Sequence, residues 1–193
     1  MTDEPVSAHA SGLAKVCSAV ALVGFMGAGK TTVGRELALR LGWRFADIDE
    51  LVQEREQRTV EQIFREDGEP VFRRLEFKVV REAIISLEIS PMVLALGGGA
   101  FIEPGIQECL RTAEVPTAFL DAPVAELFRR CDQPGVNRPL RRNMEEFQQL
   151  YESRRPEYLK ATTRIETTGK TIATVAQEII SGLNLVPVSG ARA

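Results

Sequence analysis

One glycine-rich segment near the start of the chain constrains its fold more than any other feature. Residues 24–31 read Gly-Phe-Met-Gly-Ala-Gly-Lys-Thr and match G-x-x-x-x-G-K-[ST] at every fixed position. Gly27 and Gly29 permit backbone conformations that point successive N–H groups inward, toward an anion. Lys30 can reach the β- and γ-phosphates of a nucleotide, and the Thr31 hydroxyl can ligate magnesium. The segment is therefore interpreted as a phosphate-binding loop (P-loop).

The residues on either side of this segment fit a strand before it and a helix after it. Residues 16–25 are continuously apolar, as in a strand that is buried on both faces of a sheet. Residues 32–41 carry apolar positions at helical spacing, and Gly42 follows as a stop signal. The alternative is a glycine-rich turn with an exposed lysine, and the flanking strand and helix argue against it.

The rest of the chain alternates between short apolar runs and longer helical periods. This alternation predicts an α/β fold in which a parallel sheet is covered on both faces. Further strands are expected at 44–48, 92–96, 117–120 and 163–167. Helices are expected over 49–68 (one or two), 71–87, 124–131, 143–159 with an interruption near Pro156, and 172–183.

Length and charge limit the classes of function. The 193 residues suffice for one well-buried core and not for two ordinary domains, so we expect one domain at 16–186 between flexible tails at 1–15 and 187–193. The formal net charge of -3 leaves no basic excess for binding a phosphate backbone, so we expect no nucleic-acid partner. No apolar run approaches the roughly 20 residues that a membrane span needs, so we expect no membrane partner.

The termini and the cysteines indicate a cytoplasmic location. Residues 1–15 lack a basic start followed by an apolar stretch and do not read as a secretory signal. Cys17, Cys109 and Cys131 are an odd number of cysteines without CxxC spacing, which is typical of free thiols in a reducing compartment.

Two aspartates follow the expected second strand. Residues two apart on a strand point the same way, so the Asp47 and Asp49 carboxylates should both project from its carboxyl end, where open α/β sheets bind ligands. One can help to hold magnesium, and the other can accept a proton or a hydrogen bond from an alcohol. The alternative is a pair of surface acids that cap the next helix.

Glycines and arginines mark the remaining candidate positions. Three glycines, 97–99, follow the expected third strand, which indicates close backbone approach, whereas one glycine would suffice for a flexible turn. Residues 132–142 combine proline, glycine and arginine, and we expect them to be a mobile lid. Arginine binds carboxylates and phosphates in a bidentate manner. The candidate arginines are Arg73, Arg74, Arg130, Arg138, Arg141, Arg142, Arg154 and Arg155.

In their order along the chain, these motifs resemble those of the shikimate kinase family, a relative of the nucleoside monophosphate kinases. The resemblance covers nearly all of residues 16–183. It implies a P-loop three-layer fold with a five-stranded parallel sheet in the order 2-3-1-4-5. It also implies transfer of the γ-phosphoryl group of ATP, with Mg²⁺, to the 3-hydroxyl of shikimate, giving shikimate 3-phosphate in the pathway to chorismate and aromatic amino acids. We expect the protein to be a monomer.

The resemblance also implies roles for the residues that match. Residues 45–49 are similar to the family's aspartate pair, in which the first aspartate lies near magnesium and the second holds the substrate hydroxyls. The catalytic residues would be Lys30, Asp49 and Arg138. The ATP-binding residues would be Gly27, Ala28, Gly29, Lys30, Thr31, Thr32, Arg130 and Arg138. The metal ligands would be Thr31 and Asp47. The shikimate-binding residues would be Asp49, Arg73, Gly97, Gly98, Gly99 and Arg154.

Three motifs and one further arginine carry the substrate, lid and adenine assignments. Residues 72–76 resemble F-R-x-x-E, in which Arg73 would bind the shikimate carboxylate. Residues 154–158 resemble R-x-P-x-Y, in which Arg154 would be the second carboxylate ligand. In the lid motif at 137–140, Arg138 would reach both phosphates and substrate. Arg130 matches the arginine that stacks on adenine, and the region after Glu166, which touches adenine in the family, matches weakly.

Two other functions fit part of the pattern. A kinase for another small polyol acid, such as gluconate, would share the P-loop and lid, but the combination of Asp47, Asp49, Arg73 and 97–99 argues against it. A nucleotide-dependent switch would bind nucleotide without a small substrate. A GTPase of that class should carry an N-K-x-D motif, and the sequence has none.

Overall fold

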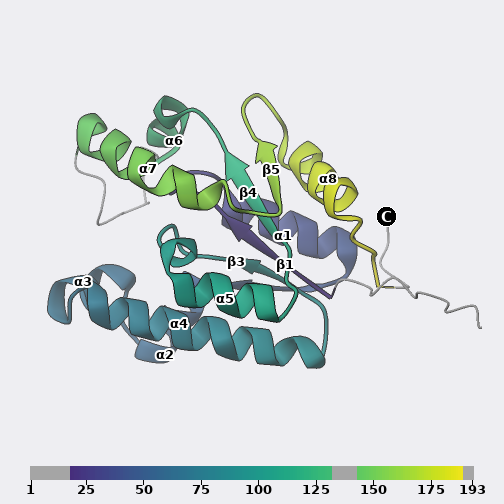
Figure 1. The fold of residues 1–193 in the computed structure, drawn as a ribbon, viewed down its shortest axis with the longest axis horizontal. Coiled ribbons are helices and arrows are strands. Elements are labelled where there is room, and N and C mark those ends of the chain that lie inside the picture. The colour runs from purple at the N-terminus through teal and green to yellow at the C-terminus, as the bar shows by residue number, and fades with distance from the viewer. Residues whose placement is uncertain (1–17, 132–142, 189–193) are drawn as a thin grey trace, which may run out of the picture.

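Five parallel strands form the central sheet of the computed structural model, which describes residues 18–131 and 143–188 (Figure 1). The strands lie in the order β2-β3-β1-β4-β5, and each neighbouring pair is parallel. The predicted fold class and strand order are therefore confirmed. The strands are β1 Ala19–Val23, β2 Arg44–Asp47, β3 Met92–Ala95, β4 Thr117–Asp121 and β5 Thr163–Glu166.

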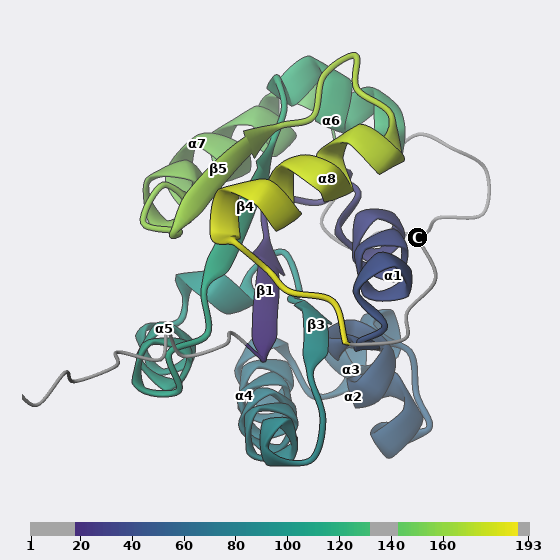
Figure 2. The ribbon, with the colours of Figure 1, turned by 90° about the vertical axis from the view of Figure 1, so that its right-hand side faces the viewer.

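Helices cover both faces of this sheet. On one face α1 packs against α8, and on the other α4 packs against α5 (Figures 1 and 2). The α-helices are α1 Lys30–Leu41, α2 Ile48–Glu56, α3 Val60–Glu66, α4 Glu69–Ile85, α5 Pro104–Thr112, α6 Val124–Cys131, α7 Met144–Tyr158 and α8 Ile172–Leu183. Two short 3₁₀ helices are η1 Ser86–Glu88 and η2 Ala100–Ile102. No helix in the described residues is long and apolar enough to cross a membrane.

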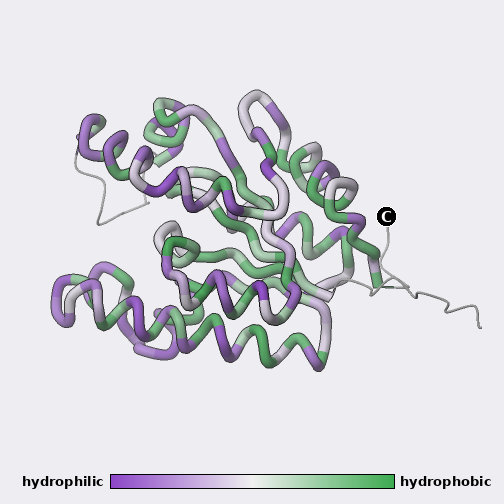
Figure 3. The backbone as a smooth tube through the Cα atoms, viewed as in Figure 1, coloured by the Kyte–Doolittle hydropathy of each residue, from purple (hydrophilic) through white to green (hydrophobic). Residues whose placement is uncertain are grey.

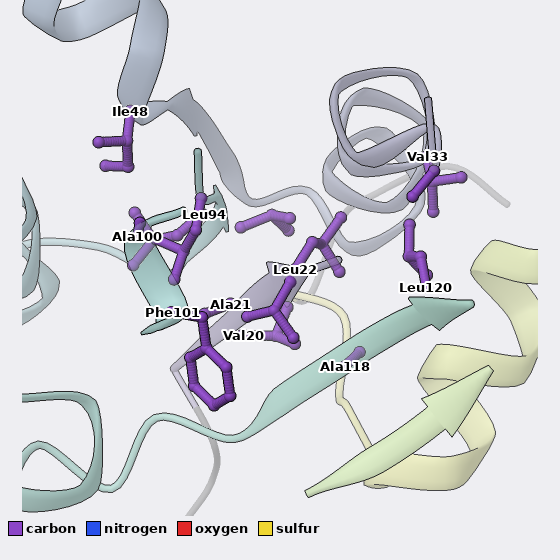
Figure 4. Packing of buried hydrophobic residues seen from close by; sticks show 14 of the residues in the cluster. Val20, Ala21, Leu22, Val33, Ile48, Leu94, Ala100, Phe101, Ala118 and Leu120 are labelled. Atoms are coloured by element: carbon purple, nitrogen blue, oxygen red, sulfur yellow. The ribbon is translucent and has the colours of Figure 1, made fainter. Parts of the chain in front are cut away.

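The hydrophobic core lies between the sheet and its helices. All five residues of β1 are buried, as expected for the central strand of a parallel sheet. Figure 4 shows Leu22, Leu94 and Leu120, from three neighbouring strands, among the buried apolar side chains. Hydrophobic residues follow the strands, whereas the outer helices mix polar and apolar positions (Figure 3). This core fixes the carboxyl ends of the strands, where the candidate site lies.

Two predictions about helices need correction. The interruption predicted near Pro156 is wrong, because α7 continues through that residue to Tyr158. Pro156 stands in the last turn, and beyond it the buried Tyr158 ring stacks on Phe119 at 5.3 Å between centroids, which anchors the end of the helix. Helix α5 is absent from the predicted set, although Pro104 stands in its first turn, a recognised helix-start signal.

Close packing of α1 on the sheet gives a stability test. A Cβ at Gly34 would lie 2.5 Å from Phe45 Cε2 and 3.2 Å from Leu22 Cδ1. We expect Gly34→Val to lower the free energy of unfolding by about 1–3 kcal/mol through overpacking, as measured by urea unfolding. Gly182→Ala in α8 is the control, because its Cβ would meet only Thr163 Oγ1, at 3.8 Å. That variant should be neutral or more stable, and equal destabilisation of both would contradict the packing explanation.

Candidate active site

The P-loop leaves the carboxyl end of β1 and runs directly into α1. Gly24, Gly27 and Gly29 all have positive φ, at 142°, 82° and 89°. A Cβ at Gly27 would lie 2.5 Å from the Leu127 carbonyl oxygen of α6. A side chain at this position would therefore be strained in backbone conformation and obstructed by a neighbouring helix. The loop is held between β1, α1 and α6 in the conformation that its glycines permit.

The two polar residues that end the loop contact different groups. The Lys30 ammonium donates hydrogen bonds to the carbonyl oxygens of Gly24 at 2.9 Å and Phe25 at 3.1 Å. It therefore lies over the mouth of the loop. The Thr31 hydroxyl donates to Oδ2 of Asp47 at 2.6 Å. This bond joins the start of α1 to the end of β2 and brings two oxygen donors together beside the loop.

The aspartate pair differs from its predicted geometry. Strand β2 ends at Asp47, and the backbone turns into α2 at Ile48, so Asp49 lies in the first turn of a helix. The prediction that both carboxylates project in one direction from a strand is therefore wrong. Oδ1 of Asp47 accepts the N–H groups of Asp49 at 3.0 Å and Glu50 at 3.4 Å, which caps α2. Both carboxylates still lie at the carboxyl edge of the sheet, and Asp49 lines the pocket next to the P-loop.

That pocket brings together segments that are far apart in the sequence. Its volume is about 120 Å³. The lining residues that the motifs predict are Asp49, Arg73, Gly97, Gly98, Gly99 and Arg154. The lining residues without a predicted role are Met26, Val60, Phe64, Phe72 and Glu76. The apolar members could not be distinguished from ordinary core residues by pattern alone.

The glycines after β3 are packed against charged side chains. A Cβ at Gly97 would clash with Glu76 Oε1 and lie 2.7 Å from Asp49 Oδ1. A Cβ at Gly99 would clash with the guanidinium group of Arg73. The prediction of close approach at these positions is confirmed, and the neighbours are the polar side chains of the pocket itself.

Arg73 is oriented by two carboxylates on its own helix. Its Nη1 lies 2.6 Å from Glu76 Oε2, and its Nη2 lies 2.8 Å from Glu69 Oε1. Glu76 is fully buried, and its Oε1 has no hydrogen-bond partner among the described residues. Burial raises the pKa of the Glu76 carboxyl to about 7, although the charge of Arg73 opposes this shift. Glu76 therefore presents one unpaired oxygen in the wall of the pocket.

Arg154 reaches the same pocket from α7. Its Nη1 donates to the Gly98 carbonyl oxygen at 3.3 Å, and its guanidinium carbon lies 5.9 Å from the centroid of the Phe25 ring. The Tyr158 hydroxyl donates to the same Gly98 oxygen. Helix α7 is thereby tied to the glycine-rich segment, and Arg73 and Arg154 line one cavity.

Comparison with known proteins agrees with this arrangement. The family model for shikimate kinase matches residues 26–184. The chain belongs to the shikimate kinase family. It is 42% identical over 163 residues to a shikimate kinase of Geobacter metallireducens, covering 83% of this chain and 88% of the relative. It is 37% identical over 160 residues to a shikimate kinase of Persephonella marina, and the match covers 82% of this chain and 94% of the relative.

Solved structures support the same family. A shikimate kinase of Acinetobacter baumannii in complex with shikimate superimposes with a TM-score of 0.80 at 32% identity, over 87% of this chain and 93% of the other. A gluconokinase of Sinorhizobium meliloti superimposes with a TM-score of 0.58 at 19% identity, over 86% of this chain and 91% of the other. This is a likeness of fold alone. As a member of the shikimate kinase family, the chain is an ATP-dependent kinase, and the switch-protein alternative falls away.

Arg130, which the resemblance assigns to ATP, is not among the described residues that line this pocket. Arg130, near the end of α6, donates from Nε to Glu126 Oε1 at 3.0 Å and from Nη1 to Thr167 Oγ1 at 3.1 Å. It therefore joins α6 to the segment that follows β5. Arg138 and the predicted lid at 132–142 lie outside the described residues.

The buried Glu76 carboxyl gives a prediction about pH. Its pKa is about 7 in the folded chain against an ordinary value of 4.5, so the folded chain binds more protons between these values. The free energy of unfolding should therefore fall as pH rises from 4.5 to about 7, and the Glu76→Gln variant should lack this contribution. Urea unfolding at several pH values across that range measures the difference.

Glu108→Gln is the matched control for this experiment. Glu108 is exposed, and its hydrogen bond from Arg111 lowers the pKa of its carboxyl. The contribution of the charged Glu108 carboxylate to the free energy of unfolding is lost only as the pH falls below its ordinary pKa. The Glu108→Gln variant should therefore keep the pH trend of the unaltered protein between pH 4.5 and about 7. A trend that survives in Glu76→Gln would show that another group titrates.

Proposed function

We propose that this chain transfers the γ-phosphoryl group of ATP to the 3-hydroxyl of shikimate, releasing ADP and shikimate 3-phosphate for the pathway to chorismate and aromatic amino acids. One observation carries the proposal. Arg73 and Arg154, which are far apart in the sequence, line the same small pocket with Asp49, beside the P-loop. Two guanidinium groups and a carboxylate suit a ligand that carries both a carboxylate and hydroxyl groups.

In this proposal the two ends of shikimate meet different side chains. Arg73 and Arg154 bind its carboxylate, and the glycines at 97–99 let the ring approach the backbone. Asp49 accepts a hydrogen bond from the reacting hydroxyl and orients its oxygen toward the P-loop. Phosphoryl transfer passes through a loose transition state, so positioning contributes more than early removal of the hydroxyl proton.

The P-loop residues 27–32 bind the phosphates of ATP in the same proposal. Their backbone N–H groups and the start of α1 present positive potential to the β- and γ-phosphates. Lys30 has its ammonium group at the mouth of the loop and spreads the charge on the transferred group. Arg138 would share this role and Arg130 would stack on adenine. These two assignments rest on the sequence motifs.

The residues beside the loop fit a magnesium ion. Mg²⁺ is typically held by one or two carboxylates with phosphate oxygens and water, and not by an all-protein cage. Thr31 Oγ1 and Asp47 Oδ2 are two hard oxygen donors 2.6 Å apart at the P-loop. The described residues contain no group of three or more His, Cys, Asp or Glu that could hold a metal by themselves. When bound, the ion would neutralise charge on the phosphates.

Several broader assignments stay predictions. They are a single domain at 16–186 with a lid at 132–142 and tails at 1–15 and 187–193, a monomeric state, and a cytoplasmic location.

A coupled ADP-release assay tests the proposed reaction. We expect turnover that requires shikimate, ATP and magnesium together, because each contributes to the site described above. Gluconate is the matched alternative acceptor, since it also carries a carboxylate and hydroxyl groups. Equal turnover with gluconate, or none with shikimate, would contradict the assignment.

The two pocket arginines can be tested separately from the nucleotide site. Lysine keeps the positive charge but cannot form two parallel hydrogen bonds with a carboxylate. We expect Arg73→Lys and Arg154→Lys each to raise the KM for shikimate by roughly 10- to 100-fold, which corresponds to one charge-assisted bond. The KM for ATP should change little.

Arg81→Lys is the control for these variants. Arg81 is on α4 like Arg73, but it packs on the Phe77 ring and lines a different surface, so its substitution should leave both KM values unchanged. If neither pocket substitution altered the shikimate dependence, the carboxylate clamp would be wrong.

A further inference from the structure

Asp121 is a buried carboxylate that the proposed reaction does not use. It is the last residue of β4 and is 2% exposed. Its Oδ1 accepts a hydrogen bond from the Tyr151 hydroxyl at 2.7 Å. Its Oδ2 lies 3.3 Å from Arg155 Nη2 and accepts from Arg164 Nε at 2.9 Å. A buried charge is costly unless it is paired and hydrogen-bonded, so this carboxylate depends on its partners and fixes their positions.

Two of these partners belong to α7 and also contact each other. Arg155 Nε donates to the Tyr151 hydroxyl oxygen at 3.1 Å, so Asp121, Tyr151 and Arg155 form a closed triangle. Burial, together with the hydrogen bond to Asp121, raises the pKa of Tyr151 to about 12. The hydroxyl therefore stays protonated near neutral pH and remains a donor to the carboxylate. Helix α7 is held at two successive turns by one residue of the sheet.

The same stretch of α7 contacts the P-loop. The Tyr151 ring meets Phe25 edge to face at 5.5 Å, and the Phe147 ring meets Phe25 at 4.9 Å. Phe25 follows Gly24 in the P-loop and is fully buried. Arg154, next to Arg155, places its guanidinium group over the same Phe25 ring. Figures 1 and 2 both show α7 close to the end of β4.

We propose that Asp121 is a positioning residue that fixes α7 through Tyr151 and Arg155 and so holds Arg154 at the correct place beside the P-loop. The inference rests on the proposed function, because it takes Arg154 to be a ligand of the shikimate carboxylate. Displacement of α7 would separate this guanidinium group from Arg73 across the pocket. The backbone conformation of the P-loop depends on its own glycines and on the packing of Gly27 against α6, so we expect it to be retained although α7 also contacts Phe25.

Asp121→Asn is the most direct test, because it conserves the shape of the side chain. The amide oxygen can still accept from Tyr151. An NH₂ group, itself a donor, replaces the oxygen that accepts from Arg155 and Arg164, so donors face donors there. We expect the KM for shikimate to rise about tenfold, the loss of one charge-assisted bond. The KM for ATP should stay within about twofold, since the contacts of the P-loop backbone are retained.

Tyr151→Phe separates the hydrogen bond from the packing. The ring still contacts Phe25, but the donor to Asp121 is lost, so the KM for shikimate should rise about threefold. The double variant should raise the KM for shikimate more than either single variant, because Asp121→Asn alters the contact with Arg155 and Tyr151→Phe removes a different hydrogen bond to the same side chain. Tyr151→Phe also keeps the test available if Asp121→Asn does not fold.

Arg164→Gln is the matched control. Arg164 pairs with the same carboxylate, at 2.8 Å from Nη2 to Oδ2, but it lies on β5 and is half-exposed. It does not belong to α7, so its substitution should leave the KM for shikimate within about twofold of the unaltered value.

The outcomes separate this inference from the proposed function. If Asp121→Asn lowers only the melting temperature, or raises both KM values equally, Asp121 is merely structural and the inference is overturned. An Arg164→Gln effect as large as that of Asp121→Asn would overturn it as well. An unchanged KM for shikimate in Arg154→Lys alone would also overturn the inference, because Asp121 is proposed to act through Arg154. If the unaltered protein needs no shikimate, the proposed function itself fails.

Discussion

The position of β1 between β3 and β4 is the constraint on which the rest of the site depends. Parallel strands end at the same edge, so the segments that follow these three strands must meet there. The P-loop follows β1, the glycines at 97–99 follow β3, and Asp121 ends β4. Strand β2, on the far side of β3, adds Asp47, which bonds Thr31 at the start of α1. The residues proposed to bind phosphate and those proposed to bind substrate therefore meet because of the strand order.

Much of this arrangement could be predicted because its signals are local. The P-loop depends on glycine conformations and on a strand and a helix next to it, all within one short segment. The substrate residues could be proposed because their motifs occur in a fixed order. Geometry that depends on a backbone turn is harder to predict, because residues 47–49 fit both the end of a strand and the capped start of a helix, and the structure begins the helix at Ile48. The aspartate pair was therefore placed at the correct edge with the wrong orientation.

Residues whose role depends on burial could not be recognised from sequence. Glu76 stands in a helix of mixed polarity, where a glutamate is usually exposed, yet it is fully buried, with Gly97 packed against its carboxyl group. The same holds for Asp121, which looks like a polar residue at the end of a strand. In each case the distinguishing fact is a contact between segments far apart in the sequence, which no local pattern encodes.

Glu76 and Asp121 are two buried carboxylates that restrain a pocket arginine in different ways. An arginine that binds a small anion must be held rigidly, yet its long side chain has many conformations to lose. Glu76 bonds Arg73 directly within α4. Asp121 instead bonds Tyr151 and Arg155, which flank Arg154 on α7. A buried carboxylate can restrain an arginine by pairing with it, but that pairing competes with the ligand for the guanidinium group. Restraining the helix leaves the guanidinium group of Arg154 available, so the two sides of the pocket offer arginines with different freedom to bind a carboxylate.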